Sequence, residues 1–191
     1  MVPDLWLNIK ALIKEGIRFC HPHTIKHLYN TIAVPTLTYG IELCNLTPLV
    51  NKLDTEGRKA IKLLFNMSMY SKNYLNTLLN IEYISTRIIR NKFNLFTRLL
   101  HGETTATPLM KMLETPAAAG SFVADIRNIA LAQNIDVVQV IVSRECPPIN
   151  IELPELPEDL HNRLLQFLNN WSDAESRRNF REVVEERVVR Q

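Results

Sequence analysis

The sequence is poor in glycine and cysteine and has no long apolar run. Five glycines in 191 residues leave few loops whose backbone amides could cradle a phosphate, and no glycine-flanked serine or HExxH motif is present. Three scattered cysteines, Cys20, Cys44 and Cys146, cannot build a disulfide framework. We therefore expect a reducing, intracellular setting, nuclear or cytoplasmic. No stretch reaches the roughly 18 apolar residues of a membrane span, so no membrane partner is expected.

Acidic residues are scarce in the middle of the chain and concentrated at its end. Residues 52–98 hold nine Lys and Arg against three Asp and Glu, a net charge of +6. Residues 145–191 hold ten acidic residues against six Arg, a net charge of −4. The overall charge of +2 hides this asymmetry. The basic middle favours contact with a polyanion.

Apolar residues recur at helical spacing along most of the chain. This pattern predicts helices over residues 4–17, 23–35, 47–67, 74–79, 85–101 and 121–133, and two more after Pro157. Asp136–Ser143 is ambiguous because its β-branched residues suit a strand. We favour helix there, since no other segment reads as a strand. The predicted fold class is all-α: an irregular multi-helix bundle, with a thumb-like helical domain and a smaller C-terminal helical tail.

Several local signals refine these helices. Pro35 cannot donate its amide, so the helix from about His23 must kink there or restart with the proline in a first turn. Thr47 and Pro48 are typical of an N-cap followed by a first helical residue. Ser172 and Glu175 form a capping-box pattern that predicts the start of the last helix.

Composition also suggests boundaries between domains. Residues 1–102 form the predicted helical domain. Residues 103–120 are rich in Thr, Pro, Ala and Gly and predict a linker around a short segment, Leu109 to Leu113. Residues 121–191 form the predicted helical tail, with a proline-rich connector at about 146–157.

A search for catalytic chemistry yields no candidate. Cys20, His21, His23 and His27 could suggest zinc, but no second ligand pair follows at zinc-finger spacing. A histidine face near a helix start explains them as well. We therefore predict no catalytic residues, no metal site and no cofactor.

Basic side chains along the outer faces of two long predicted helices are the strongest chemical signal. With tyrosines 70, 74 and 83 between them, they suit a phosphate backbone with some stacking of bases. Solvated basic faces are nevertheless common on helices. The predicted nucleic-acid-binding residues are Lys52, Lys59, Lys62, Arg87, Arg90 and Arg98.

The series LYNTIAVPTLTYG, with Tyr29, Pro35, Leu37, Tyr39 and Gly40 in order, is followed by two Lys- and Arg-bearing helices. This series resembles the region just downstream of the polymerase domain in non-LTR (LINE-type) retrotransposon reverse transcriptases, over roughly residues 5 to 102. The turn at IEYIS, between Asn80 and Ser85, departs from the family pattern. The palm aspartates of a YADD-like box and a CCHC knuckle are absent from the sequence.

The resemblance implies a thumb and post-thumb region of a protein whose parent family is an RNA-directed DNA polymerase. It implies that a short set of residues packs against the palm or another partner, and that this chain is not itself an enzyme, because the metal-holding aspartates are missing. The palm- or partner-packing residues are Leu28, Tyr29, Ile32, Pro35, Tyr39 and Gly40.

Two functions of different classes remain open at this point. The first is a non-catalytic remnant or domesticated fragment that binds an RNA–DNA hybrid or other nucleic acid weakly and in a salt-dependent way. The second is a helical interaction module that uses its palm-facing surface to bind a protein partner or another copy of itself. A functionless retroelement fragment is a further alternative.

Overall fold

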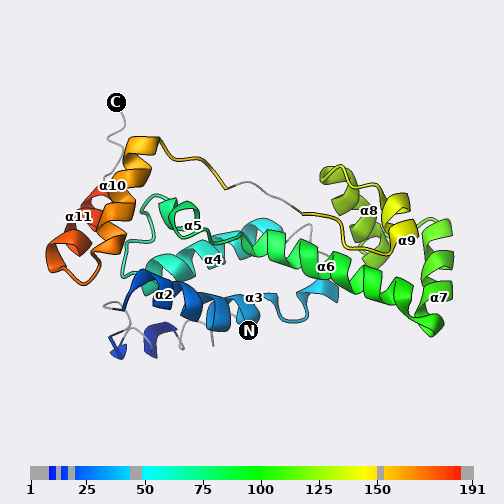
Figure 1. The fold of residues 1–191 in the computed structure, drawn as a ribbon. Helices are drawn as coiled ribbons and strands as arrows, with labels where there is room; N and C mark the ends of the chain where they lie inside the picture. Colours follow the sequence, from blue (N-terminus) through cyan, green and yellow to red (C-terminus); the bar gives the residue numbers. More distant parts are fainter. Residues whose placement is uncertain (1–8, 12–13, 17–19, 44–48, 150–152, 186–191) are drawn as a thin grey trace. The chain divides into compact units, whose positions relative to one another are not determined.

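Helices make up the regular structure of the chain (Figure 1). The computed structural model describes residues 9–11, 14–16, 20–43, 49–149 and 153–185, and no strand occurs in these ranges. Their α-helices are Pro22–Leu28 (α2), Val34–Thr38 (α3), Val50–Leu64 (α4), Tyr74–Leu78 (α5), Ile84–His101 (α6), Glu103–Glu114 (α7), Phe122–Ala132 (α8), Val137–Ser143 (α9), Glu158–Asn169 (α10) and Ala174–Glu185 (α11). The all-α prediction is confirmed. Most of the predicted helix at 4–17 and the predicted cap at Thr47 and Pro48 lie outside the described residues.

Two compact units divide the chain, and neither is continuous in sequence. The first unit contains the described residues of Met1–Leu37, Asp54–Tyr83 and Glu152–Gln191. The second unit contains those of Thr38–Leu53 and Ile84–Ile151. These units do not follow the predicted boundaries at 102 and 120. Composition indicates where a chain bends, whereas the units are set by which distant helices pack together.

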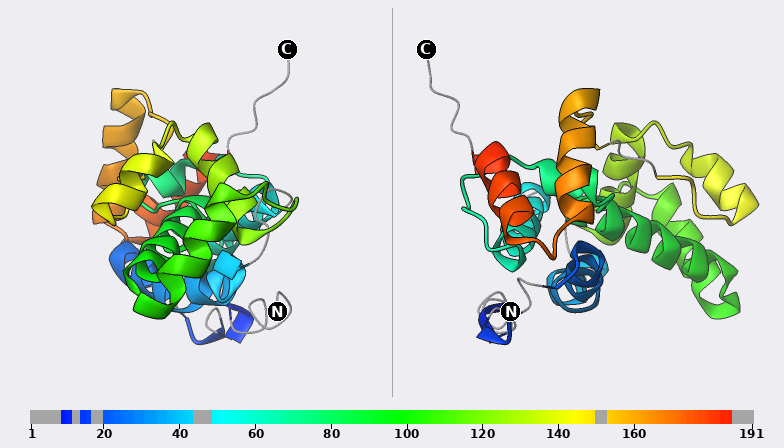
Figure 2. Two further views of the ribbon diagram at one scale, coloured as in Figure 1. Left: turned by 90° about the vertical axis from the view of Figure 1, so that its right-hand side faces the viewer. Right: turned by 60° about the vertical axis from the view of Figure 1, so that its left-hand side comes forward.

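An aromatic cluster forms the centre of the first unit. The ring of Trp171 makes edge-on contacts with Phe65 and with Phe180, each with a centroid separation of 5.4 Å. All three side chains are fully buried. Helices α10 and α11 lie side by side (Figure 2). Trp171, in the segment between them, contacts Phe65 directly after α4, and Phe180 of α11 packs against Trp171. Each aromatic side chain removed from water contributes about 1.5–3 kcal/mol of hydrophobic free energy.

The chain around Pro35 contains a wide helical turn. Helix α2 continues into a π-helical segment, Tyr29–Ala33, and the amide of Val34 donates to the carbonyl of Tyr29, five residues earlier. Pro35 then lies in the first turn of α3. Residues 22–38 are helical without a break, so the structure does not show the restart. The wide π-helical turn directly before Pro35 is the distortion that accommodates a proline at this point of a continuous helix.

The core of the second unit surrounds α6. Helices α7, α8 and α9 each contact α6, as Figure 1 shows. Phe93 and Phe96 meet edge to face with centroids 6.5 Å apart. The buried cluster consists of Ile89, Phe93, Phe96, Leu100, Leu109, Val123, Ile126, Ala130, Val140 and Ile149. The helix predicted over residues 85–101 is confirmed as α6.

Helix α7 occupies Glu103–Glu114, where composition predicted a linker around a short segment. Pro108 lies inside the helix and would normally interrupt it. Leu109 is nevertheless 5% exposed within the core of the second unit, with Leu113 packed against the same core. Burial of this apolar side outweighs the unfavourable composition, so the linker prediction is corrected for residues 103–114.

Side-chain caps settle the ambiguous segment after α8. The Asp136 carboxylate accepts hydrogen bonds from the amides of Val138 (2.8 Å) and Gln139 (3.3 Å), so it caps α9. Ser121 caps α8 in the same way through the amide of Ala124. The helical interpretation of Asp136–Ser143 is therefore confirmed, because an aspartate cap outweighs the strand preference of the valines.

The last helix begins one residue later than predicted. Asp173, not Ser172, accepts a hydrogen bond from the amide of Ser176 at 2.7 Å. That bond and one from the Ser176 hydroxyl hold the pKa of Asp173 below its ordinary value. Both Ser172 and Asp173 can cap a helix, and the adjacent aspartate takes the position.

A buried ion pair joins α6 to α8. The Nζ atom of Lys92 lies 2.5 Å from the Oδ2 atom of Asp125, and these side chains are 0% and 1% exposed. The ammonium group also lies 5.3 Å from the centre of the Phe122 ring. Burying two opposite charges costs desolvation free energy. Only close contact of the charges with each other and with neighbouring polar groups offsets this cost.

Breaking this pair should cost far more than replacing it. We expect Lys92→Met or Asp125→Leu alone to lower the free energy of unfolding by about 3–5 kcal/mol, because each removes one charge of the buried ion pair and leaves the opposite charge in the core. The double variant should be close to wild type or more stable. Urea denaturation followed by circular dichroism measures all three. Single variants no less stable than the double variant would show that the pair does not act as a unit.

The cap of α11 should give stability an acidic limit. The pKa of Asp173 is lower in the folded protein than in the unfolded chain. Its contribution to folding stability is therefore fully present above the unfolded pKa of about 3.8 and is lost as the pH falls through the folded pKa. Asp173→Asn retains a capping oxygen but cannot titrate. Denaturation of both proteins across an acid pH series should show that the free energy of unfolding falls more steeply with decreasing pH for the wild type than for Asp173→Asn. Parallel curves would contradict this assignment of the cap.

Candidate nucleic-acid interface

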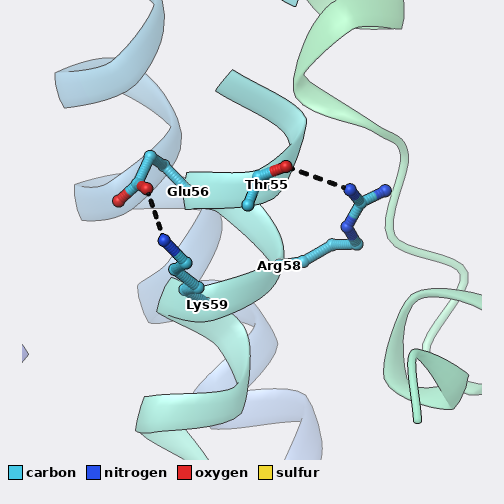
Figure 3. A network of polar contacts seen from close by, with 4 residues as sticks. All are labelled: Thr55, Glu56, Arg58 and Lys59. Atoms are coloured by element: carbon cyan, nitrogen blue, oxygen red, sulfur yellow. Dashed lines mark hydrogen bonds and ion pairs between the residues drawn. The ribbon is translucent and has the colours of Figure 1, made fainter. Parts of the chain in front are cut away.

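Helix α4 carries Lys52 and Lys59, two of the six predicted nucleic-acid-binding residues. Lys52 is exposed. The side chain of Lys59 is 41% exposed, and its Nζ atom lies 2.9 Å from the Oε1 atom of Glu56. Figure 3 shows this pair on one side of the helix and the Arg58–Thr55 hydrogen bond, 3.2 Å long, on the other. Lys59 is therefore within reach of a ligand, although Glu56 offsets part of its charge.

Lys62, predicted to bind phosphate, is instead an internal residue. It is 6% exposed. Its Nζ atom donates to the carbonyl oxygen of Met69 at 3.3 Å and, more closely, to that of Ser71. Burial, and then the charge of Arg58, lower its pKa from 10.5. The prediction for Lys62 is corrected, because its ammonium group is directed to backbone carbonyls of its own unit.

Helix α6 contributes the three predicted arginines. Arg87 and Arg90 are half-buried, and Arg98 is exposed. The Nη2 atom of Arg90 donates to the carbonyl oxygen of Ile149 at 3.3 Å. Arg98 is therefore the arginine of this helix that is most accessible to a phosphate.

Arg98 borders a polar hollow on α6 of about 490 Å³. Asn91, Asn94 and Thr97 form the rest of its lining. Asn91, Asn94 and Arg98 are exposed and follow one another at spacings of three and four residues, so they share one face of the helix. Among the residues that the structure describes, the lining offers amide and guanidinium donors and no carboxylate, which suits an anionic ligand.

The three tyrosines between the two helices differ in accessibility. Tyr70 is 98% exposed. Tyr74 and Tyr83 are half-buried, with the Lys72 ammonium 5.7 Å from the centre of the Tyr74 ring and the Arg58 guanidinium 6.0 Å from that of Tyr83. Of the three, Tyr70 has the ring that is most open to an incoming base.

The predicted palm- or partner-packing residues do not form one exposed surface. Tyr29 is 1% exposed and Tyr39 is 82% exposed, while Leu28 and Ile32 are half-buried and Pro35 is exposed. Tyr29 therefore belongs to the interior and is corrected as a contact residue. Gly40 has a φ angle of +70°, a left-handed conformation that glycine adopts at little cost.

The histidines near α2 have a local structural role. The Nδ1 atom of His21 accepts the amide of His23 at 3.3 Å and caps α2. The two rings stack with centroids 5.2 Å apart. Among the described residues, no group of three or more His, Cys, Asp and Glu side chains is placed to hold a metal ion.

Comparison with known proteins gives no relative for this chain: no family model, curated protein or solved structure matches it. In the part of the chain that the structure describes, no helix has the length and apolar character needed to cross a membrane.

Sequence reasoning missed the burial of Lys62 and Lys92 and did not assign Asn91 or Asn94 to the site. Lys92 lies three residues after Ile89 and four before Phe96, so its position on the apolar face of α6 was a usable signal. Asn91 and Asn94 lie seven and four residues before Arg98, so helical spacing places them on the same face of α6 as Arg98. Lys62 carried a weaker signal, because its carbonyl partners are fixed by the turn after α4.

Substitution at Lys62 should separate its structural role from phosphate binding. We expect Lys62→Met to lower the free energy of unfolding by about 1–3 kcal/mol, because it removes the donor from the Met69 and Ser71 carbonyls. Lys59→Met on the same helix should change it by no more than about 0.5 kcal/mol. Urea denaturation provides the comparison. Equal free energies of unfolding for the two variants would show that Lys62 does not have the structural role assigned to it.

Proposed function

We propose that this chain binds nucleic acid through contacts with the phosphate backbone. The observation that carries the proposal is the exposed guanidinium of Arg98 beside a hollow lined by Asn91, Asn94 and Thr97, with no carboxylate among the described lining residues. Lys52, exposed in the same unit, adds a second accessible cation. The net charge of +6 over residues 52–98 supports the same conclusion.

The proposed binding is weak and depends on salt. Cations that contact phosphates release counterions, and a surface that does not read base edges reaches dissociation constants of roughly 10⁻⁴ to 10⁻⁶ M. Lys62 and Lys92 contribute to the charge count but are buried. Fewer phosphate contacts are therefore proposed than the sequence alone suggests.

We further propose that the chain derives from the thumb and post-thumb region of a non-LTR retrotransposon reverse transcriptase, acting as a non-catalytic remnant or domesticated fragment. The support is the ordered series from Tyr29 to Gly40, with its proline directly after a π-helical turn and its glycine at positive φ. No chemical step is proposed, because the palm aspartates that hold metal ions are absent from the sequence.

A second candidate function is protein interaction, favoured by a separate observation. Leu131, Val138 and Val142 of the second unit are 81%, 67% and 78% exposed. Val138 and Val142 lie four residues apart and share a face of α9. Exposed apolar groups of this kind mark interaction surfaces when they are contiguous.

Binding to a fluorescent RNA–DNA hybrid, followed by anisotropy across about 50 to 200 mM salt, tests the first proposal. We expect Lys52→Gln with Arg98→Gln to reduce the slope of log K against log salt by nearly 2, at about 0.9 for each lost phosphate contact. The matched control is Lys111→Gln with Arg163→Gln, which removes the same charge from exposed positions on α7 and α10. Equal slopes for the two variants, or no binding at the lowest salt, would leave the interaction module as the better proposal.

A further inference from the structure

We propose that the turn Ser68–Lys72 presents Tyr70 as a stacking platform for an unpaired base of a single-stranded nucleic acid. In this proposal Lys59 and Lys10 bind the phosphates that flank the base. The inference rests on the proposed function and extends it from duplex phosphates to an unpaired strand, at a site in the first unit.

The backbone on both sides of Tyr70 is held in place from inside the protein. Lys62 donates to the carbonyl oxygens of Met69 and Ser71, the residues immediately before and after Tyr70. The Ser68 hydroxyl accepts the amide of Tyr70 at 3.3 Å, and the Ser71 hydroxyl donates to the Ser68 carbonyl at 2.7 Å. The turn is therefore fixed by buried groups although its central side chain faces solvent.

Helix α11 also holds this turn at both ends. The amide of Ser68 donates to the Oε1 atom of Glu185 at 2.7 Å. The amide of Lys72 donates to the carbonyl oxygen of Val184 at 3.1 Å. A platform that is ordered before binding loses less conformational entropy when a ligand arrives. Such ordering distinguishes Tyr70 from an aromatic residue on a loosely held loop.

The surface next to Tyr70 is hollow and mostly apolar. The hollow has a volume of about 780 Å³ and is lined by Tyr70, Met69, Leu63, Lys10, Lys59 and Glu56. Tyr70 is 98% and Met69 39% exposed, so a ring can approach both. A flat aromatic base fits this combination, because its faces are apolar and its edges remain in water.

The charges around the hollow indicate which aromatic ligand it suits. Lys10 is exposed and Lys59 is 41% exposed, whereas its partner Glu56 is 15% exposed. The accessible charge is thus mainly positive, which complements the phosphates on either side of a base. Bases in a duplex are already stacked on each other, so a tyrosine can take up only an unpaired base without unstacking them.

Anisotropy with a fluorescent oligo-dT of about 12 nucleotides tests the platform. We expect Tyr70→Ala to weaken single-strand binding about 5- to 100-fold and Tyr70→Phe to retain it, because stacking needs the ring and not the hydroxyl. Tyr39→Ala is the matched control: Tyr39 is also exposed, at 82%, but belongs to the second unit. It should leave binding unchanged.

Salt dependence separates stacking from phosphate contact. Tyr70→Ala should leave the salt slope of oligo-dT binding unchanged, whereas Lys59→Gln should lower it by roughly 0.7, the value for one contact on a single strand. Affinity for the RNA–DNA hybrid should be the same in Tyr70→Ala and wild type. Because Tyr70 is exposed, its substitution leaves the core intact, and circular dichroism checks this.

The outcomes distinguish this inference from the proposed function. If the chain binds the hybrid but not oligo-dT, the platform is overturned and the proposed function stands. The same holds if the chain binds the hybrid, and Tyr70→Ala and Tyr39→Ala bind oligo-dT equally strongly. Loss of binding in Tyr70→Phe as large as in Tyr70→Ala also overturns it, since the hydroxyl would then be the contact. Absence of binding to either nucleic acid rejects both proposals.

Discussion

The buried contact between Lys92 and Asp125 sets how α8 lies against α6 in the second unit. Both groups are buried, and their 2.5 Å separation fixes α8 against α6 at one register. An apolar contact tolerates small shifts of one helix along another, whereas an ion pair without access to water does not. The phenylalanines of α6 and the apolar side chains of α7, α8 and α9 then pack around this fixed point.

The first unit uses a lysine in a comparable way, with a different partner. Lys62 reaches from α4 to the carbonyl oxygens of the following turn, and α11 binds the amides at the ends of the same turn. Each unit therefore buries one lysine of residues 52–98: Lys62 in the first unit and Lys92 in the second. The surface charge of residues 52–98 is lower than the sequence count, and the proposed interface consists of what remains outside.

Much of the fold could be predicted from the sequence, because apolar periodicity reports directly on helix faces. Helices α4, α5, α6, α8 and α10 follow that pattern closely. Helix α7 could not be predicted, because Pro108 and the Thr-rich composition disfavour a helix and only tertiary burial of Leu109 compensates. The site was less predictable. Whether a lysine faces water or a carbonyl depends on turns and distant helices, and local spacing does not encode these.

The interleaving of the two units sets an order for their formation during synthesis. Every described residue of the second unit precedes residue 150, so its chain is complete while the C-terminal helices are still unmade. The first unit is completed later, because Trp171, which packs on Phe65, lies more than 100 positions further along the chain and is itself packed against Phe180. Domains assemble as their segments emerge from the ribosome. Until the segment from α10 to α11 is made, Phe65 lacks its aromatic contact with Trp171.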